Sequence, residues 1–156
     1  MALLLFLSIP VLVGNYQLTG NVAILFAITS LPVAIKEEFL FRGILQNLLT
    51  GRLGALKAIL VTNLVFTLWH VGVWSPSVWV FSQIFLAGVL LGLVYWRSGS
   101  IMAVIVLHTV YDAIFSFTPF TSSPLNENWG FIPMLSAVAL VACWAFRRRS
   151  PEVIRD

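Results

Sequence analysis

Long apolar segments are the feature that most limits what this chain can fold into. Short stretches rich in Gly, Pro, Ser or Asn separate them, as loops do. Segments of about 20 apolar residues are typical of helices that cross a membrane, and the spacing of Gly88 and Gly92 lets two such helices approach closely. The pattern predicts an all-α fold, a polytopic transmembrane helical bundle with about six membrane segments. These lie at about residues 2–13, 21–49, 53–72, 78–96, 100–117 and 130–146.

Charged residues are scarce, which excludes most classes of soluble protein. Of the 156 residues, 60% are hydrophobic and 10% are charged, whereas a soluble domain carries about 25% charged residues. The net charge of +3 is too diffuse to indicate binding to nucleic acid. Cys143 is the single cysteine, which excludes an internal disulfide, and its apolar neighbours predict a packed core thiol. The N-terminal segment lacks the basic start of a signal peptide, so we interpret it as a membrane helix.

The positions of Lys and Arg predict the orientation of the bundle. These residues follow the second, fourth and sixth segments, and the loops after the first, third and fifth segments hold none. Cytoplasmic loops are enriched in Lys and Arg. We therefore expect a plasma-membrane protein with both termini in the cytoplasm, a single transmembrane domain over residues 1–146 and a basic cytoplasmic tail over 147–156. The basic residues concerned are Arg52, Lys57, Arg97, Arg147, Arg148, Arg149 and Arg155.

Charged residues inside the second segment need an explanation, because each costs about 2.5–3.5 kcal/mol at the bilayer centre. The stretch KEEFLFR places Lys36, Glu37, Glu38 and Arg42 within seven positions. Glu38 and Arg42 share one helix face, with Gln46 one turn further, so their spacing predicts an internal ion pair. Glu37 is rotated by about 100° from its neighbour. It cannot share the Arg42 partner equally well, and we expect it to point elsewhere.

Both histidines of the chain also fall in apolar segments. His70 ends one segment, and His108 lies in another with Asp112 one turn later on the same face. With Glu37 they predict one cavity open to the cytoplasmic side. A Glu can act there as general base on a water while His positions the water or stabilises an oxyanion. The alternative from the same residues is a zinc ion bound by His70, His108 and Asp112, because two His and a carboxylate match a catalytic zinc site.

Three motifs, EEFLFR, FTLWH and HTVYD, occur in this order along the chain. They resemble the E-E-x-x-x-R, F-x-x-x-H and H-x-x-x-N/D motifs of the CAAX prenyl endopeptidase and bacteriocin-processing family (CPBP, or Abi) of intramembrane proteases. The resemblance covers about residues 30–115. It implies glutamate-dependent peptide hydrolysis in a helical membrane bundle. By this match Glu37 is the catalytic base, His70 positions the water, and His108 faces the developing oxyanion.

The resemblance also bears on the other charged residues. Glu38 and Arg42 match the supporting ion pair of the family. Asp112 matches a position that is Asn in some relatives, and an ionised Asp cannot donate a hydrogen bond to an oxyanion. Asp112 is therefore expected to be protonated, to orient His108 or to bind a metal. The predicted function is an intramembrane endopeptidase whose partners are the lipid bilayer and a membrane-embedded or lipidated protein or peptide substrate.

Two other classes of function stay open. A catalytically silent scaffold on the same fold would hold and regulate a membrane partner, but it has no need of Glu37, His70 and His108 together. A proton-coupled transporter would use a relay of Glu, His and Asp. Six helices without inverted repeats or broken helices make the transporter the weaker alternative.

Overall fold

The computed structural model describes residues 2–13, 20–72, 78–117 and 131–147, and every secondary-structure element in these ranges is a helix. The prediction of an all-α fold is confirmed. Most predicted segment boundaries agree with the helices to within a few residues. In chain order the elements are α1 (Ala2–Val13), α2 (Asn21–Glu38), η1 (Phe39–Gln46), α3 (Asn47–Leu53), α4 (Ala55–Trp69), α5 (Val78–Ser98), α6 (Ile101–Phe117) and α7 (Phe131–Phe146).

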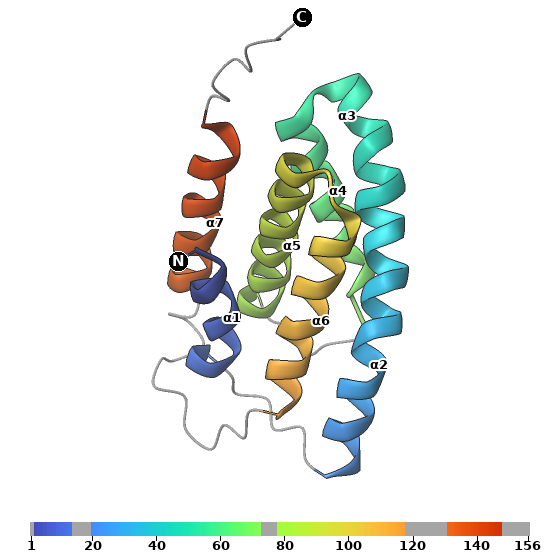
Figure 1. The fold of residues 1–156 in the computed structure, drawn as a ribbon, viewed down its shortest axis with the longest axis vertical. Helices are drawn as coiled ribbons and strands as arrows, with labels where there is room; N and C mark the ends of the chain where they lie inside the picture. The colour runs from blue at the N-terminus through green and yellow to red at the C-terminus, as the bar shows by residue number, and fades with distance from the viewer. Residues whose placement is uncertain (1, 14–19, 73–77, 118–130, 148–156) are drawn as a thin grey trace, which may run out of the picture.

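Successive helical segments alternate in direction, so the chain forms an up-and-down bundle (Figure 1). α2, η1 and α3 continue one another with helical backbone angles at both junctions and form one long rod. The rod ends at Gly54, whose φ is 77°. The turn predicted over residues 50–52 is wrong, because Gly51 stays helical and only Gly54 takes the positive φ that ends a helix.

η1 is a π-helix, in which backbone hydrogen bonds join residues i and i+5. It begins directly after Glu38 and contains the rest of the charged motif. No pattern in the sequence predicted it. Three of its side chains, those of Phe41, Arg42 and Gln46, are buried in the bundle. π-helical turns are rare in proteins, and those that occur often lie at functional sites. This part of the rod is therefore a candidate location for a functional site.

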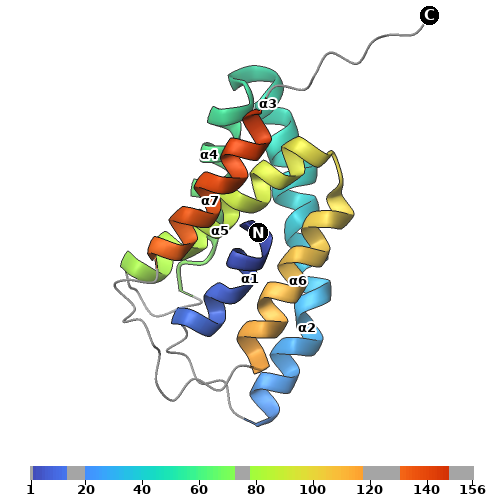
Figure 2. The ribbon, with the colours of Figure 1, turned by 60° about the vertical axis from the view of Figure 1, so that its left-hand side comes forward.

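The hydrophobic core lies between α5, α6 and α7, and α1 completes it. Leu90, Val104 and Met134 are fully buried at these contacts. α1 lies between α6 and α7 (Figure 2), and its Phe6 ring stacks on the Tyr111 ring with centroids 4.6 Å apart. The N-terminal segment is thus a packed element of the bundle.

The outer surface of the bundle is strongly apolar. Large exposed hydrophobic side chains include Leu25, Ile28, Leu48, Leu64 and Val106. Soluble proteins rarely expose large continuous apolar patches, so this surface suits a lipid environment. Cys143 on α7 is exposed as well. The predicted packing of this thiol in the core is wrong, because apolar neighbours in such a bundle also occupy outward-facing positions.

One described helix is long and apolar enough to cross a membrane, judged by length and composition: the Val80–Ser98 part of α5. Shorter apolar runs occur in Ala55–Trp69, Ile101–Ser116 and Ile132–Phe146. A helix of 15 residues, such as α4, is about 22 Å long, less than a hydrocarbon core of about 30 Å. The six-segment bundle, its domain limits and its orientation therefore stay predictions. The basic tail after Arg147 lies outside the described residues.

Candidate active site

Glu38 lies at the centre of the polar groups inside the bundle. Its side chain is fully buried, and its Oε1 atom lies 3.0 Å from Nη1 of Arg42 and 2.7 Å from Nδ1 of His108. The contact with Arg42 is the one expected from their spacing. The contact with His108 joins the long rod to α6, which packs along α2. One carboxylate oxygen therefore accepts hydrogen bonds from two helical segments.

Arg42 is completely buried and is held from several sides. Its Nη2 donates to Oδ1 of Asn63 at 3.1 Å and to the carbonyl oxygen of Gly88 at 3.0 Å. Its guanidinium carbon lies 4.8 Å from the centroid of the Phe66 ring. A buried charge that loses its partner lowers the stability of the fold by about 3–5 kcal/mol. The contacts of Arg42 therefore stabilise its charge in the interior. Arg42 connects η1 to α4 and α5 and holds Glu38 in place.

Two glycines allow α5 to approach this row of polar side chains. Gln46 Nε2 donates to the carbonyl oxygen of Gly92 at 3.0 Å, as Arg42 does to that of Gly88. A Cβ atom on Gly88 would overlap the Asn63 side chain, and one on Gly92 would lie 2.9 Å from Oε1 of Gln46. The predicted close approach of helices at these glycines is confirmed. Their bare backbone also exposes carbonyl oxygens to side chains of η1.

Glu37 has a different environment from Glu38, although the two are adjacent in sequence. Glu37 is 5% exposed, and its Oε1 lies 3.9 Å from Nζ of Lys36, an exposed residue. Its carboxylate accepts no hydrogen bond from any residue that the structure describes. The two carboxylates therefore differ as the rotation between them predicted: Glu38 takes Arg42 as its partner, and Glu37 does not.

His108 and Asp112 lie beside each other on α6, close to both glutamates. His108 Nε2 is 3.5 Å from Oδ2 of Asp112, so its ring has a carboxylate oxygen near each nitrogen. Asp112 also interacts electrostatically with Glu37, Glu38 and His70. The ionisable residues of the three sequence motifs are therefore brought into one region. Whether they line a cavity open to the cytoplasmic side stays a prediction.

His70 sits just beyond the end of α4. The helix ends at Trp69, and the chain turns through Gly72, whose φ is 90°; the predicted segment to residue 72 was too long for this reason. His70 Nδ1 lies 2.8 Å from the carbonyl oxygen of Phe66, so this nitrogen donates and Nε2 remains for another partner. The Phe66 ring centroid lies 4.6 Å from that of His70 and 6.3 Å from that of His108.

The three residues predicted as zinc ligands are not arranged as a metal site. No three His, Cys, Asp or Glu side chains within the described ranges are placed to hold a metal ion. Glu38 occupies Nδ1 of His108, and the backbone of Phe66 occupies Nδ1 of His70. These bonds leave Nε2 as the remaining donor atom of each ring, and no group of three ligands within the described ranges includes them with Asp112.

Asn63 contributes to this polar network, although no sequence motif indicated it. It is fully buried on α4, and its Nδ2 donates to the carbonyl oxygen of Ile59 at 2.7 Å. This bond leaves Oδ1 directed at Arg42. The sequence does place a side-chain amide within the apolar segment 53–72. Because buried polar groups are nearly always hydrogen-bonded, this amide could have been expected to have a partner. The sequence did not say which of the other helices held its partner.

Comparison with protein families matches residues 19–114 to the family described as type II CAAX prenyl endopeptidase Rce1-like. The match covers more than half of the 156 residues. It includes all three motifs and the elements from α2 to α6 that carry them. Comparisons with curated proteins and with solved structures gave no match. The resemblance seen in the motifs is confirmed by the family comparison, and the chain belongs to the type II CAAX prenyl endopeptidase Rce1-like family.

Proposed function

We propose that this protein is an intramembrane endopeptidase that hydrolyses a peptide bond of a membrane-associated or lipidated protein or peptide. The observation that carries the proposal is the unequal environment of two adjacent buried carboxylates. Glu38 accepts hydrogen bonds from Arg42 and His108. Glu37 accepts none from the described residues. A carboxylate held inside the protein without a hydrogen-bond donor is available to take a proton from water.

Glu37 is the general base in this proposal. It removes a proton from a water molecule whose oxygen attacks the carbonyl carbon of the substrate. His70 positions that water through Nε2, because its Nδ1 is bound to the Phe66 carbonyl. The new C–O bond gives a tetrahedral intermediate with a negative carbonyl oxygen. When the C–N bond breaks, the proton on Glu37 passes to the leaving nitrogen, and Glu37 is again ionised.

His108 faces the negative oxygen of the intermediate through Nε2. Glu38 fixes the ring from the opposite side by accepting the hydrogen bond from Nδ1 at 2.7 Å. A ring protonated on both nitrogens has a carboxylate oxygen near each, since Asp112 Oδ2 lies 3.5 Å from Nε2. Such a ring donates to the oxyanion. Asp112 then has the orienting role, one of the three that its sequence position left open.

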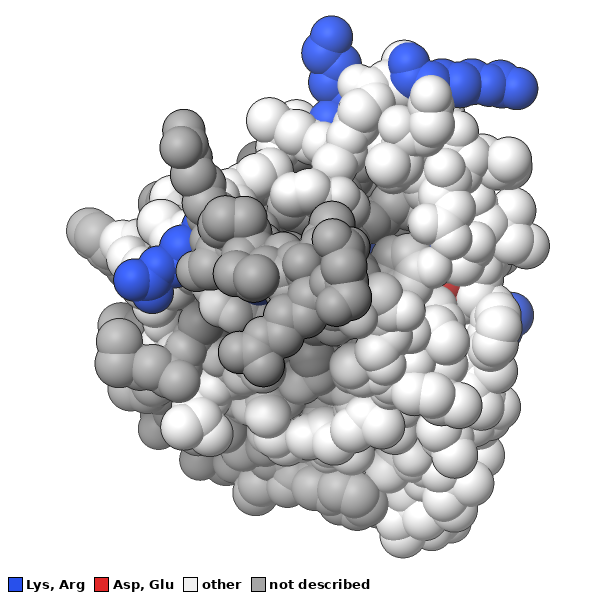
Figure 3. Space-filling model, turned by 45° about the horizontal axis from the view of Figure 1, so that its top comes forward, with Lys and Arg blue, Asp and Glu red and all other residues white. Residues whose placement is uncertain are grey.

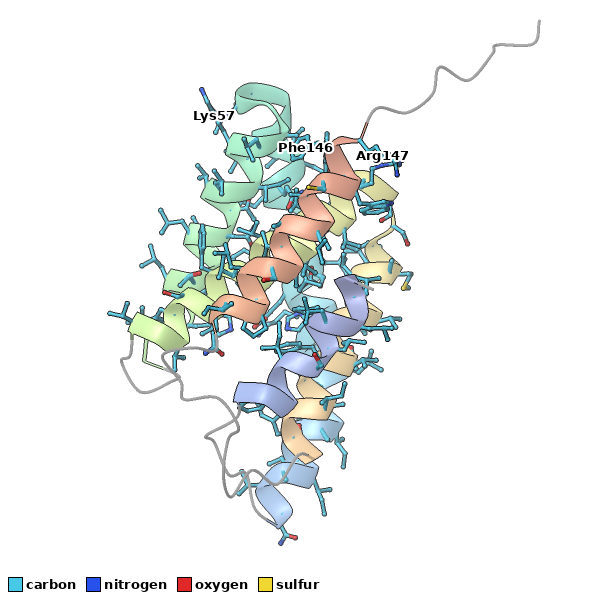
Figure 4. All side chains as sticks on the ribbon, turned by 90° about the vertical axis from the view of Figure 1, so that its left-hand side faces the viewer. Lys57, Phe146 and Arg147 are labelled. Carbon is cyan, nitrogen blue, oxygen red and sulfur yellow. The ribbon has the colours of Figure 1, made fainter. Side chains whose placement is uncertain are left out.

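Membrane embedding is part of the proposal. The family is one of membrane-embedded proteases, and α5 has the length and composition of a crossing. Lys57 and Arg147 lie at the same end of the bundle (Figure 4), and the view with this end turned forward shows Lys and Arg side chains around its edge (Figure 3). α7 ends there and α1 runs away from it (Figure 1). The positive-inside rule then favours a cytoplasmic location for this end and for both termini.

Membrane proteomes of cells that carry the native protein or Glu37→Gln test the proposal. Gln keeps the shape of Glu but cannot take the proton, so the rate should fall by about 100-fold or more. Native membranes should contain cleaved peptides that the variant's membranes lack. Lys36→Gln is the matched control, because Lys36 is the neighbouring residue with a side chain 59% exposed. It should cleave like the native protein.

The melting temperature of each purified variant separates catalysis from folding. Glu37→Gln should melt with the native protein, because Glu37 makes no hydrogen bond with the described residues. Loss of cleavage at an unchanged melting temperature supports the role of Glu37 as base. The same cleavage products in both membranes would contradict it and would favour the silent scaffold.

A further inference from the structure

A pocket of about 370 Å³ lies at the basic end of the bundle, the end that carries Lys57 and Arg147. Its residues lie outside the three motifs in the sequence. The last turn of α5 and the end of α7 form it. None of its residues belongs to the candidate active site. Its lining consists of Trp96, Arg97, Ala145, Phe146 and Arg147.

Aromatic side chains form the wall of this pocket and hold one of its cations. The ring centroids of Trp96 and Phe146 lie 4.8 Å apart, and the rings are tilted by 40°. The guanidinium carbon of Arg97 lies 5.3 Å from the centroid of the Trp144 ring. A cation over a Trp ring is attracted to its face. The pocket therefore combines a positioned guanidinium with an apolar wall.

The positive charge of the pocket has no acidic partner in the described part of the chain. Arg97 and Arg147 form no ion pair with any described residue. Nε of Arg97 is buried and has no hydrogen-bond acceptor among these residues. An unpaired buried donor destabilises the folded protein. An anionic ligand with several oxygens would pair with the guanidinium groups of Arg97 and Arg147, which line the pocket and whose planar shape matches phosphate in geometry.

We propose that this pocket binds the phosphate group of an anionic phospholipid. Arg97 and Arg147 contact the phosphate, and Trp96 and Phe146 pack against the glycerol and the first acyl carbons. The site lies where the apolar bundle meets its basic end, and Figure 4 shows Phe146 and Arg147 there together with Lys57. Trp at this level is typical of the membrane interface, and cytoplasmic leaflets are anionic. The inference rests on the proposed membrane embedding but not on proteolysis.

Titration of the purified full chain with short-chain phosphatidylglycerol in an uncharged detergent tests this site. The native protein should bind the lipid saturably. Arg97→Gln should weaken binding by about tenfold or more, because a hydrogen bond to a charged group is lost. Arg52→Gln removes the same charge from an exposed position on α3, outside the pocket. This matched control should bind within about twofold of the native protein, since surface attraction is diffuse.

Arg147→Gln keeps the test decisive if Arg97→Gln does not fold. Arg147 is exposed, so its substitution leaves the packing intact, and lipid binding should weaken by about fivefold. Equal affinities for the native protein and both pocket variants, or equal losses in the Arg52→Gln control, would overturn the pocket. Inorganic phosphate is the second probe. If it displaces the lipid at equal concentration, the site is one for free phosphate and the phospholipid assignment is wrong.

Discussion

Oε1 of Glu38 lies 2.7 Å from Nδ1 of His108, a residue 70 positions away in the sequence. The same oxygen lies 3.0 Å from Nη1 of Arg42. The first and third motifs are thus joined through one buried carboxylate. Glu38 does more than neutralise Arg42, because it also sets which way the imidazole of His108 points.

Glu38→Gln should lower both stability and activity. Gln keeps an acceptor oxygen, but it removes the charge and places an NH₂ group next to two donors. The loss of a hydrogen bond to a charged group costs about 1.5–3 kcal/mol. The cleavage rate and the melting temperature of the purified variant are the measurements. The matched control is Glu37→Gln, which should lose activity only. A Glu38→Gln protein that melts with the native one would refute the joining role.

Arg42→Ala should destabilise the protein strongly. It leaves Glu38 buried without its cationic partner and removes the donor from Asn63 and Gly88. Breaking a buried pair in this way costs about 3–5 kcal/mol. Denaturant unfolding in detergent measures the change. Arg52→Ala, at an exposed position of α3, is the control and should stay within about 0.5 kcal/mol of the native protein. Similar unfolding of both variants would argue against the buried network.

Gly88→Ala should cost about 1–3 kcal/mol by overpacking the contact between α4 and α5. The added methyl group would overlap Asn63 and lie 3.3 Å from Cδ1 of Phe66. Gly51→Ala is the matched control, because a Cβ there meets nothing within 4 Å. It lies inside α3 and should stabilise the helix by about 0.5–1 kcal/mol. Melting temperatures that move in opposite directions confirm the prediction, whereas a common direction would contradict it.

Asp112→Asn should lower the cleavage rate by about fivefold at most. The side chain of Asp112 is 20% exposed and lies 3.5 Å from Nε2 of His108, and partly exposed ion pairs contribute about 0.2–1 kcal/mol. Asn keeps the shape but cannot pair with the imidazolium. Rates of purified native protein, Asp112→Asn and Asp112→Ala make the comparison. A faster Asn variant would mean that this position donates a hydrogen bond to the oxyanion.

Treatment with a metal chelator should leave the cleavage rate unchanged. No three His, Cys, Asp or Glu side chains in the described part of the chain are placed to hold a metal ion, and the proposed base, Glu37, needs none to accept a proton from water. The measurement is the rate of purified protein before and after chelation, with metal content determined on the same sample. Loss of activity that zinc restores would show that the ligands rearrange to bind an ion.

Local pattern by itself determined much of this protein. Apolar segments and turn residues located the six helical stretches to within a few residues, because helix formation in an apolar chain depends on near neighbours. The four-residue spacing located the contact of Glu38 with Arg42. Three motifs in order were sufficient to identify the family, since they need no knowledge of packing.

Contacts between helices far apart in sequence were decided only by the tertiary structure. The bond from His108 to Glu38, the amide of Asn63 at Arg42 and the use of the Gly88 carbonyl all join different helices. The π-helix of η1 and the outward position of Cys143 were likewise not visible in the sequence. Apolar residues surround nearly every position in such a chain. Periodicity therefore cannot say which face of a helix meets another helix and which meets lipid.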